Sequence, residues 1–291
     1  MTQVLECHGH IFMDGLDLNA AISRHTGAVD TANVRHSLEA LAKNGVVYFR
    51  DGGDNLNVGL YAKSIAHEYG IHYTTPAFAI HKEGRYGKQV GRSYSAISDY
   101  HRLVIEAKKA GADFIKVMLS GIMTFKAPGA LSCPPLLADE IGALVAIAKD
   151  QGMKVMAHVN GSETIQAALE AGTDSIEHGY FMDERCIDLL VQTGAVWVPT
   201  LAPVAVFSNA PTDSGAIAGA ILKTQMEMIT MAFAKGAFVA SGSDSGSHGV
   251  LHGQGIQTEL SLLQEASRMD DTSFQKRVNA ANERVRDIFI Q

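Results

Sequence analysis

Short apolar runs recur along this chain, and seven of them directly follow a glycine that ends a segment with helical spacing. Such spacing is seen at Val34, Leu38 and Leu41, where apolar residues recur every three or four positions. A glycine just past a helix end adopts the left-handed backbone conformation without a Cβ clash. The pattern therefore predicts seven helix-to-strand joints, at Gly45, Gly70, Gly111, Gly152, Gly172, Gly194 and Gly236.

The runs after these glycines, such as VVYF and DFIKVML, are almost continuously apolar. Strands of this kind belong to a parallel sheet whose faces are covered by helices. With the first run, Gln3–His8, there are eight such strands, which predict a (β/α)8 TIM barrel forming a single domain over residues 1–291. A doubly wound open sheet would give the same local pattern and stays the alternative fold. Pro199 fits only at the end of the seventh strand, because proline has no N–H for the sheet.

Composition narrows the classes of partner. The chain is 46% hydrophobic and 19% charged with a net charge of −7, and no Lys/Arg cluster follows any predicted helix. These values predict a protein with a sizeable core that binds neither nucleic acid nor a membrane. No signal peptide is visible, and three unpatterned cysteines (Cys7, Cys133 and Cys186) favour the cytoplasm. The chain is compatible with a homo-oligomer.

Metal-binding residue types gather at the ends of the predicted strands. Lys116, His158, His178 and Asp244 lie 5, 6, 6 and 8 residues after their closing glycines, which places them at the rim where barrel active sites are built. His8 and His10 end the first strand and face the same way. The glycine-rich stretch Ser241–Gly255 follows the eighth strand and is predicted to be an active-site loop. The predicted ligands of a divalent metal are His8, His10, Lys116, His158, His178 and Asp244.

Lys116 is the most diagnostic member, because it interrupts the apolar run Phe114–Leu119. Desolvation of its ammonium group would lower its pKa. A neutral lysine amine can add CO2 to form a carbamate, whose two oxygens could bridge two metals about 3.5–4 Å apart. A lysine that reaches solvent at the strand end is the alternative.

The other candidates also have structural alternatives. His158 and His178 could be core histidines with satisfied hydrogen bonds. Glu177 competes with His178, because adjacent strand residues face opposite ways and only one of the two is expected to enter the barrel. Asp244, in SGSDSG, could be a turn residue. As the acid at the eighth strand's end, it is better placed to bind a metal and take a proton from water.

This pattern resembles the amidohydrolase superfamily: H-x-H in CHGH, lysine in FIKVMLSG, histidines in MAHVNG and IEHG, and aspartate in GSDSG. VVYFRDGG is similar to the T-x-R-D-x-G segment of the imidazolonepropionase-like and Xaa-Pro-dipeptidase-like branch. The resemblance implies two divalent metal ions, usually zinc. It assigns His8, His10 and Asp244 to the more buried ion, His158 and His178 to the other, and carboxylated Lys116 to both. Members of that branch usually carry a β-sandwich. This sequence starts on its first strand and ends after a helix near residues 274–290, so we expect a barrel that lacks the sandwich.

These features predict a metal-dependent hydrolase that cleaves an amide or other C–N bond of a small molecule by metal-activated hydroxide, with Asp244 as general acid and base. A phosphotriesterase- or lactonase-like hydrolase is one alternative, and a catalytically inactive binding or scaffold barrel is another. His81, Arg85 and Tyr86, in the stretch His81–Tyr94 after the third strand, are candidate substrate contacts; an ordinary solvated loop is the alternative there.

Overall fold

The computed structural model describes residues 3–290, in which ten strands form two sheets and every strand pair is parallel. One sheet has the order β1-β2-β3 and the other β10-β9-β8-β7-β6-β4-β5. The strands are Val4–Gly9 (β1), Val46–Asp51 (β2), His72–Thr74 (β3), Ala79–Lys82 (β4), Gly91–Tyr94 (β5), Ile115–Met118 (β6), Val155–Val159 (β7), Ser175–His178 (β8), Val196–Val198 (β9) and Phe238–Val239 (β10).

Backbone hydrogen bonds join the two sheets at both seams. At one seam, Cys7 N–H donates to the Ser241 carbonyl at 2.9 Å and Asp244 N–H donates to the His8 carbonyl at 2.8 Å. At the other seam, Asp113 N–H, just before β6, donates to the carbonyl of Thr75, just after β3, at 2.9 Å, and β4, which the sequence did not predict, pairs with β6. The fold is therefore α/β and TIM-barrel-like.

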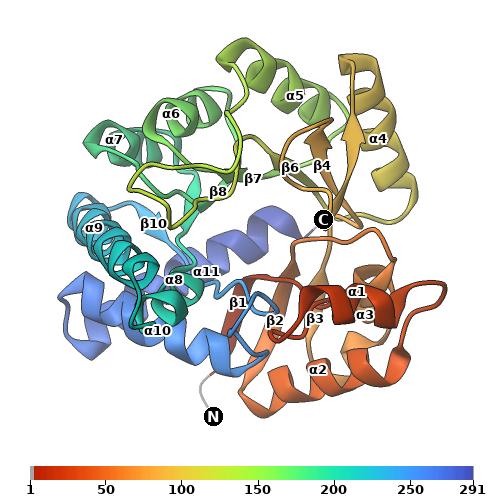
Figure 1. Ribbon diagram of the computed structural model, residues 1–291, viewed down its shortest axis with the longest axis horizontal. Coiled ribbons are helices and arrows are strands. Elements are labelled where there is room, and N and C mark those ends of the chain that lie inside the picture. Colours follow the sequence, from red (N-terminus) through yellow and green to blue (C-terminus); the bar gives the residue numbers. More distant parts are fainter. Residues whose placement is uncertain (1–2, 291) are drawn as a thin grey trace.

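Helices surround the strands, as Figure 1 shows. They are Leu18–His25 (α1), Thr31–Lys43 (α2), Val58–Ile65 (α3), the 3-10 turn Ala66–Tyr69 (η1), Ile97–Lys109 (α4), Ala138–Asp150 (α5), Ser162–Glu170 (α6), Glu184–Thr193 (α7), Leu201–Ser208 (α8), Asp213–Lys235 (α9), Gln254–Ser267 (α10) and Asp271–Phe289 (α11). Among residues 3–290, no helix combines the length and apolarity needed to cross a bilayer.

The seven predicted joints are confirmed, because all seven closing glycines have φ between 68° and 93°. Helix α7 is an example of how local sequence sets an element. Asp183 caps its start by accepting a hydrogen bond from Cys186 N–H at 3.0 Å, and Gly194 ends it with φ of 68°. Between these limits, Cys186, Ile187 and Leu190 are fully buried. The helix therefore covers the sheet with one apolar stripe.

Helix α11 lies behind the strands in the view of Figure 1 and packs against β1, β9 and β10. Its last residue, Phe289, is fully buried and stands edge-on to Phe114, with ring centroids 5.1 Å apart. The guanidinium of Arg50 lies 4.5 Å above the Phe289 ring. Through Phe289, the end of this helix therefore packs into the interior enclosed by the strands.

The stretch His81–Tyr94 is not the ordinary solvated loop that was the alternative for it. Residues 81–94 contain the end of β4 and all of β5, which pair with each other. Gly91 is needed there, since a Cβ at this position would lie 2.6 Å from the carbonyl carbon of Ala79. Pro199 follows β9 directly, as predicted for a residue without an N–H, and Ser241–Gly255 follows β10.

Candidate metal centre

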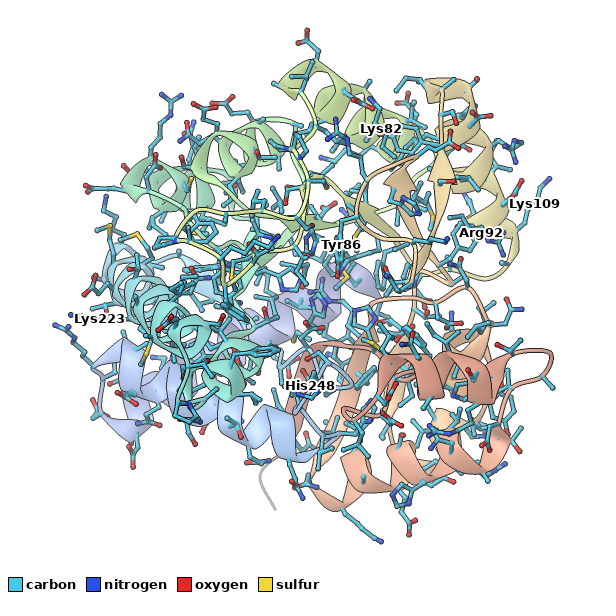
Figure 2. The ribbon with its side chains drawn as sticks, in the orientation of Figure 1. Lys82, Tyr86, Arg92, Lys109, Lys223 and His248 are labelled. Carbon is cyan, nitrogen blue, oxygen red and sulfur yellow. The ribbon has the colours of Figure 1, made fainter. Side chains whose placement is uncertain are left out.

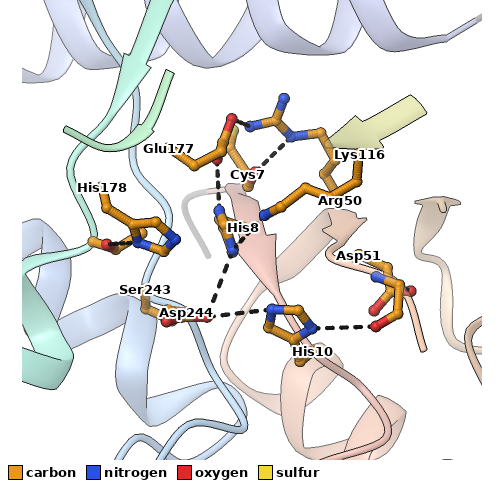
Figure 3. Close-up of polar contacts among 12 residues, drawn as sticks. Cys7, His8, His10, Arg50, Asp51, Lys116, Glu177, His178, Ser243 and Asp244 are labelled. Atoms are coloured by element: carbon orange, nitrogen blue, oxygen red, sulfur yellow. Dashed lines mark hydrogen bonds and ion pairs between the residues drawn. The ribbon is translucent and has the colours of Figure 1, made fainter. Parts of the chain in front are cut away.

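The predicted ligands converge at one end of the strands. Figure 3 shows His8, His10, Lys116, His178 and Asp244 around a common space. Nε2 of His8 and Nε2 of His10 each lie 3.6 Å from Oδ1 of Asp244. These three residues offer ligand atoms that all lie within 4.8 Å of one another. A single cation could therefore contact all three.

Lys116 lies next to this group. Its side chain is buried, with 1% exposure, and Nζ lies 3.3 Å from Nε2 of His8. The alternative of a lysine that reaches solvent is therefore wrong. Burial lowers the pKa of Lys116 to about 8, against the opposing effect of Glu177 and Asp244. A substantial fraction of the amine is thus neutral at pH values near 8.

His158 and His178 form the second part of the cluster. Their ring centroids lie 4.6 Å apart, and the His178 ring lies 5.0 Å from that of His8. His178 has φ of 67°, so the alternation of facing side chains breaks at the end of β8. As a result both Glu177 and His178 face the cluster, and the expectation that only one of them enters is wrong.

Each of the four histidines has one ring nitrogen held by a protein group. Nδ1 of His8 donates to Oε2 of Glu177 at 2.6 Å, and Nδ1 of His10 donates to the Gly53 carbonyl at 3.4 Å. Nε2 of His158 donates to the Gly121 carbonyl at 3.3 Å. These acceptors assign the tautomers and leave the second ring nitrogen of each histidine as a lone-pair donor.

His178 is held in the same way. Its Nδ1 lies 2.7 Å from Oγ1 of Thr200, and that hydroxyl donates its own hydrogen to the Pro199 carbonyl at 2.8 Å. Thr200 must therefore accept from His178 Nδ1–H, which leaves Nε2 of His178 free. Histidines oriented by an acceptor on one nitrogen are typical of metal ligands.

The RDGG run, residues 50–53 at the end of β2, supports both histidines of the H-x-H pair. Arg50 donates to Oε1 of Glu177 at 2.8 Å, and Glu177 in turn holds His8. Gly53 supplies the carbonyl that holds His10, and its own N–H donates to Asp51 at 3.1 Å. Sequence reasoning missed these supporting roles and treated Glu177 as a competing ligand. The signal was present, because a buried arginine at a strand end requires a buried acid.

Burial sets the charge state of the cluster. It lowers the pKa of His10 and of His158 to about 3, with the Lys116 ammonium lowering both further. These imidazoles are therefore neutral at pH 7, which is the form that binds a cation. Burial also raises the pKa of Asp244 to about 6, while Lys116 opposes that shift. Imidazole nitrogens and a carboxylate oxygen fit zinc and other divalent metals.

A cavity of about 420 Å³ opens from these ligands to the surface. Tyr86 and His248 line it, and the Tyr86 ring lies 5.0 Å from that of His158. His81 and Arg85 do not line it; they border a separate hollow beside β4 and β5. His252 is buried, and its Nε2 lies 3.3 Å from the His10 carbonyl.

Known proteins resemble this chain in sequence and in fold. It is 30% identical over 156 residues to the ochratoxinase of Aspergillus niger, a stretch that covers 51% of this chain and only 32% of that protein. The structure of A. niger ochratoxinase matches with a TM-score of 0.78 and 22% identity, over 97% of this chain and 71% of that one. A Xaa-Pro dipeptidase with bound methionine matches with a TM-score of 0.76 and 22% identity, over 98% and 75% of the two chains. The sequence profile of the amidohydrolase family matches residues 6–286. The chain therefore belongs to the amidohydrolase family.

Proposed function

We propose that this chain is a metal-dependent hydrolase that cleaves an amide or other C–N bond in a small molecule. The observation that carries the proposal is the set of four histidines, each held on one nitrogen by a protein acceptor, around Lys116 and Asp244. A core histidine needs no such arrangement around a shared space. Membership of the amidohydrolase family supports the same reaction class.

The proposed centre holds two divalent ions, and the proposed metal is zinc. His8, His10 and Asp244 would hold one ion, and His158 and His178 the other. Lys116 would bridge them after its neutral amine adds CO2 and releases a proton. When bound, such ions supply a Lewis acid for the scissile carbonyl and lower the pKa of a water to about 7. The free cysteines Cys7, Cys133 and Cys186 support a cytoplasmic location for the enzyme. We also propose that the chain forms a single hydrolase domain.

Asp244 is the proposed general base and acid. It borders the cavity, its side chain is 18% exposed, and its Oδ1 lies between the two histidines of the H-x-H pair. Its carboxylate would accept a proton from the attacking water and deliver it to the leaving nitrogen as the C–N bond breaks. Its backbone N–H donates to the His8 carbonyl, which anchors the main chain of Asp244 beside the H-x-H pair.

Metal analysis and one substitution test this proposal. Purified protein loaded with zinc should hold close to two equivalents. Asp244→Asn should keep most of the metal, because an amide oxygen can still coordinate, and should lose about 10²–10⁴-fold in kcat. Turnover would be measured on panels of amides, lactones and phosphotriesters. Cleavage confined to lactones or phosphotriesters, or full turnover by Asp244→Asn, would contradict the proposal.

A further inference from the structure

The wall of the cavity above the ligands is apolar. It is formed by the segment before α1, the loop after β6 and helix α8. Several of its large apolar side chains are partly exposed at the mouth, among them Leu16 at 70% and Ile122 at 43%. Exposed apolar side chains gathered at one place mark a binding surface. The apolar residues of the wall include Met13, Leu16, Leu18, Ile122, Phe125 and Phe207.

Aromatic rings continue this wall across the mouth. Phe125 and Phe207 have ring centroids 4.8 Å apart, and the His248 ring lies 5.7 Å from that of Phe207. These three residues come from the loop after β6, from α8 and from the loop after β10. The rings offer a surface on which another aromatic or aliphatic group can pack.

Among the described residues that line the cavity, Lys116 at its base is the only lysine or arginine. Figure 2 shows Tyr86 and His248 near the centre of the view, whereas Lys82, Arg92, Lys109 and Lys223 lie toward the outside. Arg85 donates to the Pro134 carbonyl at 3.3 Å, away from the cavity.

Two polar side chains of the wall, Asn160 and Tyr180, are engaged in hydrogen bonds within the protein. Nδ2 of Asn160 donates to the Gly121 carbonyl, and its Oδ1 accepts from Tyr180 N–H. The Tyr180 hydroxyl donates to the Thr200 carbonyl at 2.8 Å. A carboxylate that entered the upper cavity would therefore lose its hydration without gaining a cationic partner from the wall.

From these observations we propose that the site selects uncharged amides with a large aromatic or aliphatic group and discriminates against those that carry a free carboxylate on that group. The proposal rests on the proposed function and names its substrate class. The apolar group would lie against Ile122, Phe125 and Phe207, with the scissile carbonyl at the ligand cluster. Desolvation of a carboxylate against this wall is the source of the discrimination.

Binding to the metal-loaded protein tests the wall without relying on turnover. Two sulfonamides that an amidase does not cleave differ by one carboxylate: N-(2-phenylethyl)benzenesulfonamide and N-(benzenesulfonyl)phenylalanine. Calorimetry should give a dissociation constant at least about tenfold lower for the uncharged compound. Equal or tighter binding of the carboxylate would overturn the proposal. The amides N-(2-phenylethyl)benzamide and N-benzoylphenylalanine are then compared by kcat/KM, with the same preference expected. Selective sulfonamide binding without cleavage of either amide would contradict the proposed function and leave the assignment of the wall standing.

A matched pair of variants locates the discrimination. Ile122→Arg places a cation at the mouth, and Val191→Arg places one on α7, at a position that is equally exposed (43% and 44%) but lies outside the cavity. Ile122→Arg should shift the ratio of the two dissociation constants at least about tenfold toward the carboxylate. Val191→Arg should leave the ratio unchanged. An equal shift in both variants would overturn the wall as the discriminating surface.

Discussion

At the scale of single residues, Glu177 connects the predicted metal centre to the strand interior. One carboxylate oxygen accepts from Nδ1 of His8, and the other accepts from Arg50. All three side chains are fully buried. A buried arginine left without its acid destabilises a protein strongly, whereas the intact pair adds little net stability. Glu177 therefore serves mainly to fix the tautomer and direction of His8.

Glu177→Gln should weaken metal binding by about 10–100-fold, because the amide cannot hold His8 and Arg50 with a full negative charge. It should also lower the free energy of unfolding by about 3–5 kcal/mol, because Arg50 stays buried without a counter-charge. Chelator competition measures the first effect and urea denaturation the second. Glu68→Gln is the control, since Glu68 pairs with Arg35 on the surface and should change neither quantity. Equal metal affinity in the two variants would contradict the assigned role.

Gly52 gives His10 the room that its ring needs. A Cβ at position 52 would lie 2.5 Å from Nε2 of His10. Gly52→Ala should therefore displace the ring and reduce the metal content of the purified protein, measured by elemental analysis. Gly142→Ala is the matched control, because no atom outside its own helix lies within 4 Å of a Cβ there. It should keep the metal and stabilise α5 by about 0.5–1 kcal/mol. A Gly52→Ala protein with full metal content would contradict this reading.

At the scale of elements, the sequence predicted the regular parts of the molecule. Each closing glycine and the apolar run after it report local backbone preferences, so the eight main strands and the rim position of Lys116 follow from spacing alone. The left-handed turn at His178 could not be predicted, because it depends on Thr200 and on the packing of β8 against its neighbours. The strands β4 and β5 were missed for a related reason. Their residues include polar ones such as His81, so the sequence does not look like a strand. The two strands form because β4 pairs with both β5 and β6.

A buried acid links two of these elements. Glu259 of α10 is fully buried and accepts from Ala202 N–H, in the first turn of α8, at 2.8 Å. No described residue hydrogen-bonds to its second oxygen. Burial raises the pKa of Glu259 to about 8 from an ordinary value of 4.5. Between these two pH values the folded chain holds more of this proton than the unfolded chain, so stability falls as the pH rises through the window.

Glu259→Gln removes this titration and should flatten the decline in the free energy of unfolding between about pH 5 and pH 8. The difference in slope from the parent protein should approach one proton at most, or about 1.4 kcal/mol per pH unit. Urea denaturation at a series of pH values measures it. Glu265→Gln, at an exposed position of the same helix, should reproduce the parent slope. If Glu259→Gln also reproduced it, the acid would titrate outside this window.

At the scale of the whole molecule, the two ends of the strands have different tasks. The candidate ligands and the cavity lie at the carboxyl ends of the strands, where barrel enzymes carry their chemistry. Helix α11 packs against β1, β9 and β10 and supplies Phe289 to the interior at the other end. Arg50 spans the two regions, since its guanidinium stacks on Phe289 and bonds to Glu177. Substitutions at the α11 end should therefore change the free energy of unfolding without changing metal binding. Arg50 is the residue that contacts both regions.

Phe289→Ala tests this separation. Loss of the ring should lower the free energy of unfolding by about 3–5 kcal/mol, because a fully buried phenylalanine leaves a cavity beside Phe114. Metal stoichiometry should stay at the parent value, since the Phe289 ring packs on Phe114 and Arg50, neither of which is a candidate ligand, and Arg50 keeps its bond to Glu177. Ile290→Ala, one residue later and partly exposed, should have a much smaller effect on stability. Denaturation and elemental analysis are carried out on the same samples. If Phe289→Ala lost metal but was no less stable than Ile290→Ala, α11 would contribute to metal binding rather than to stability, and the proposed separation would be wrong.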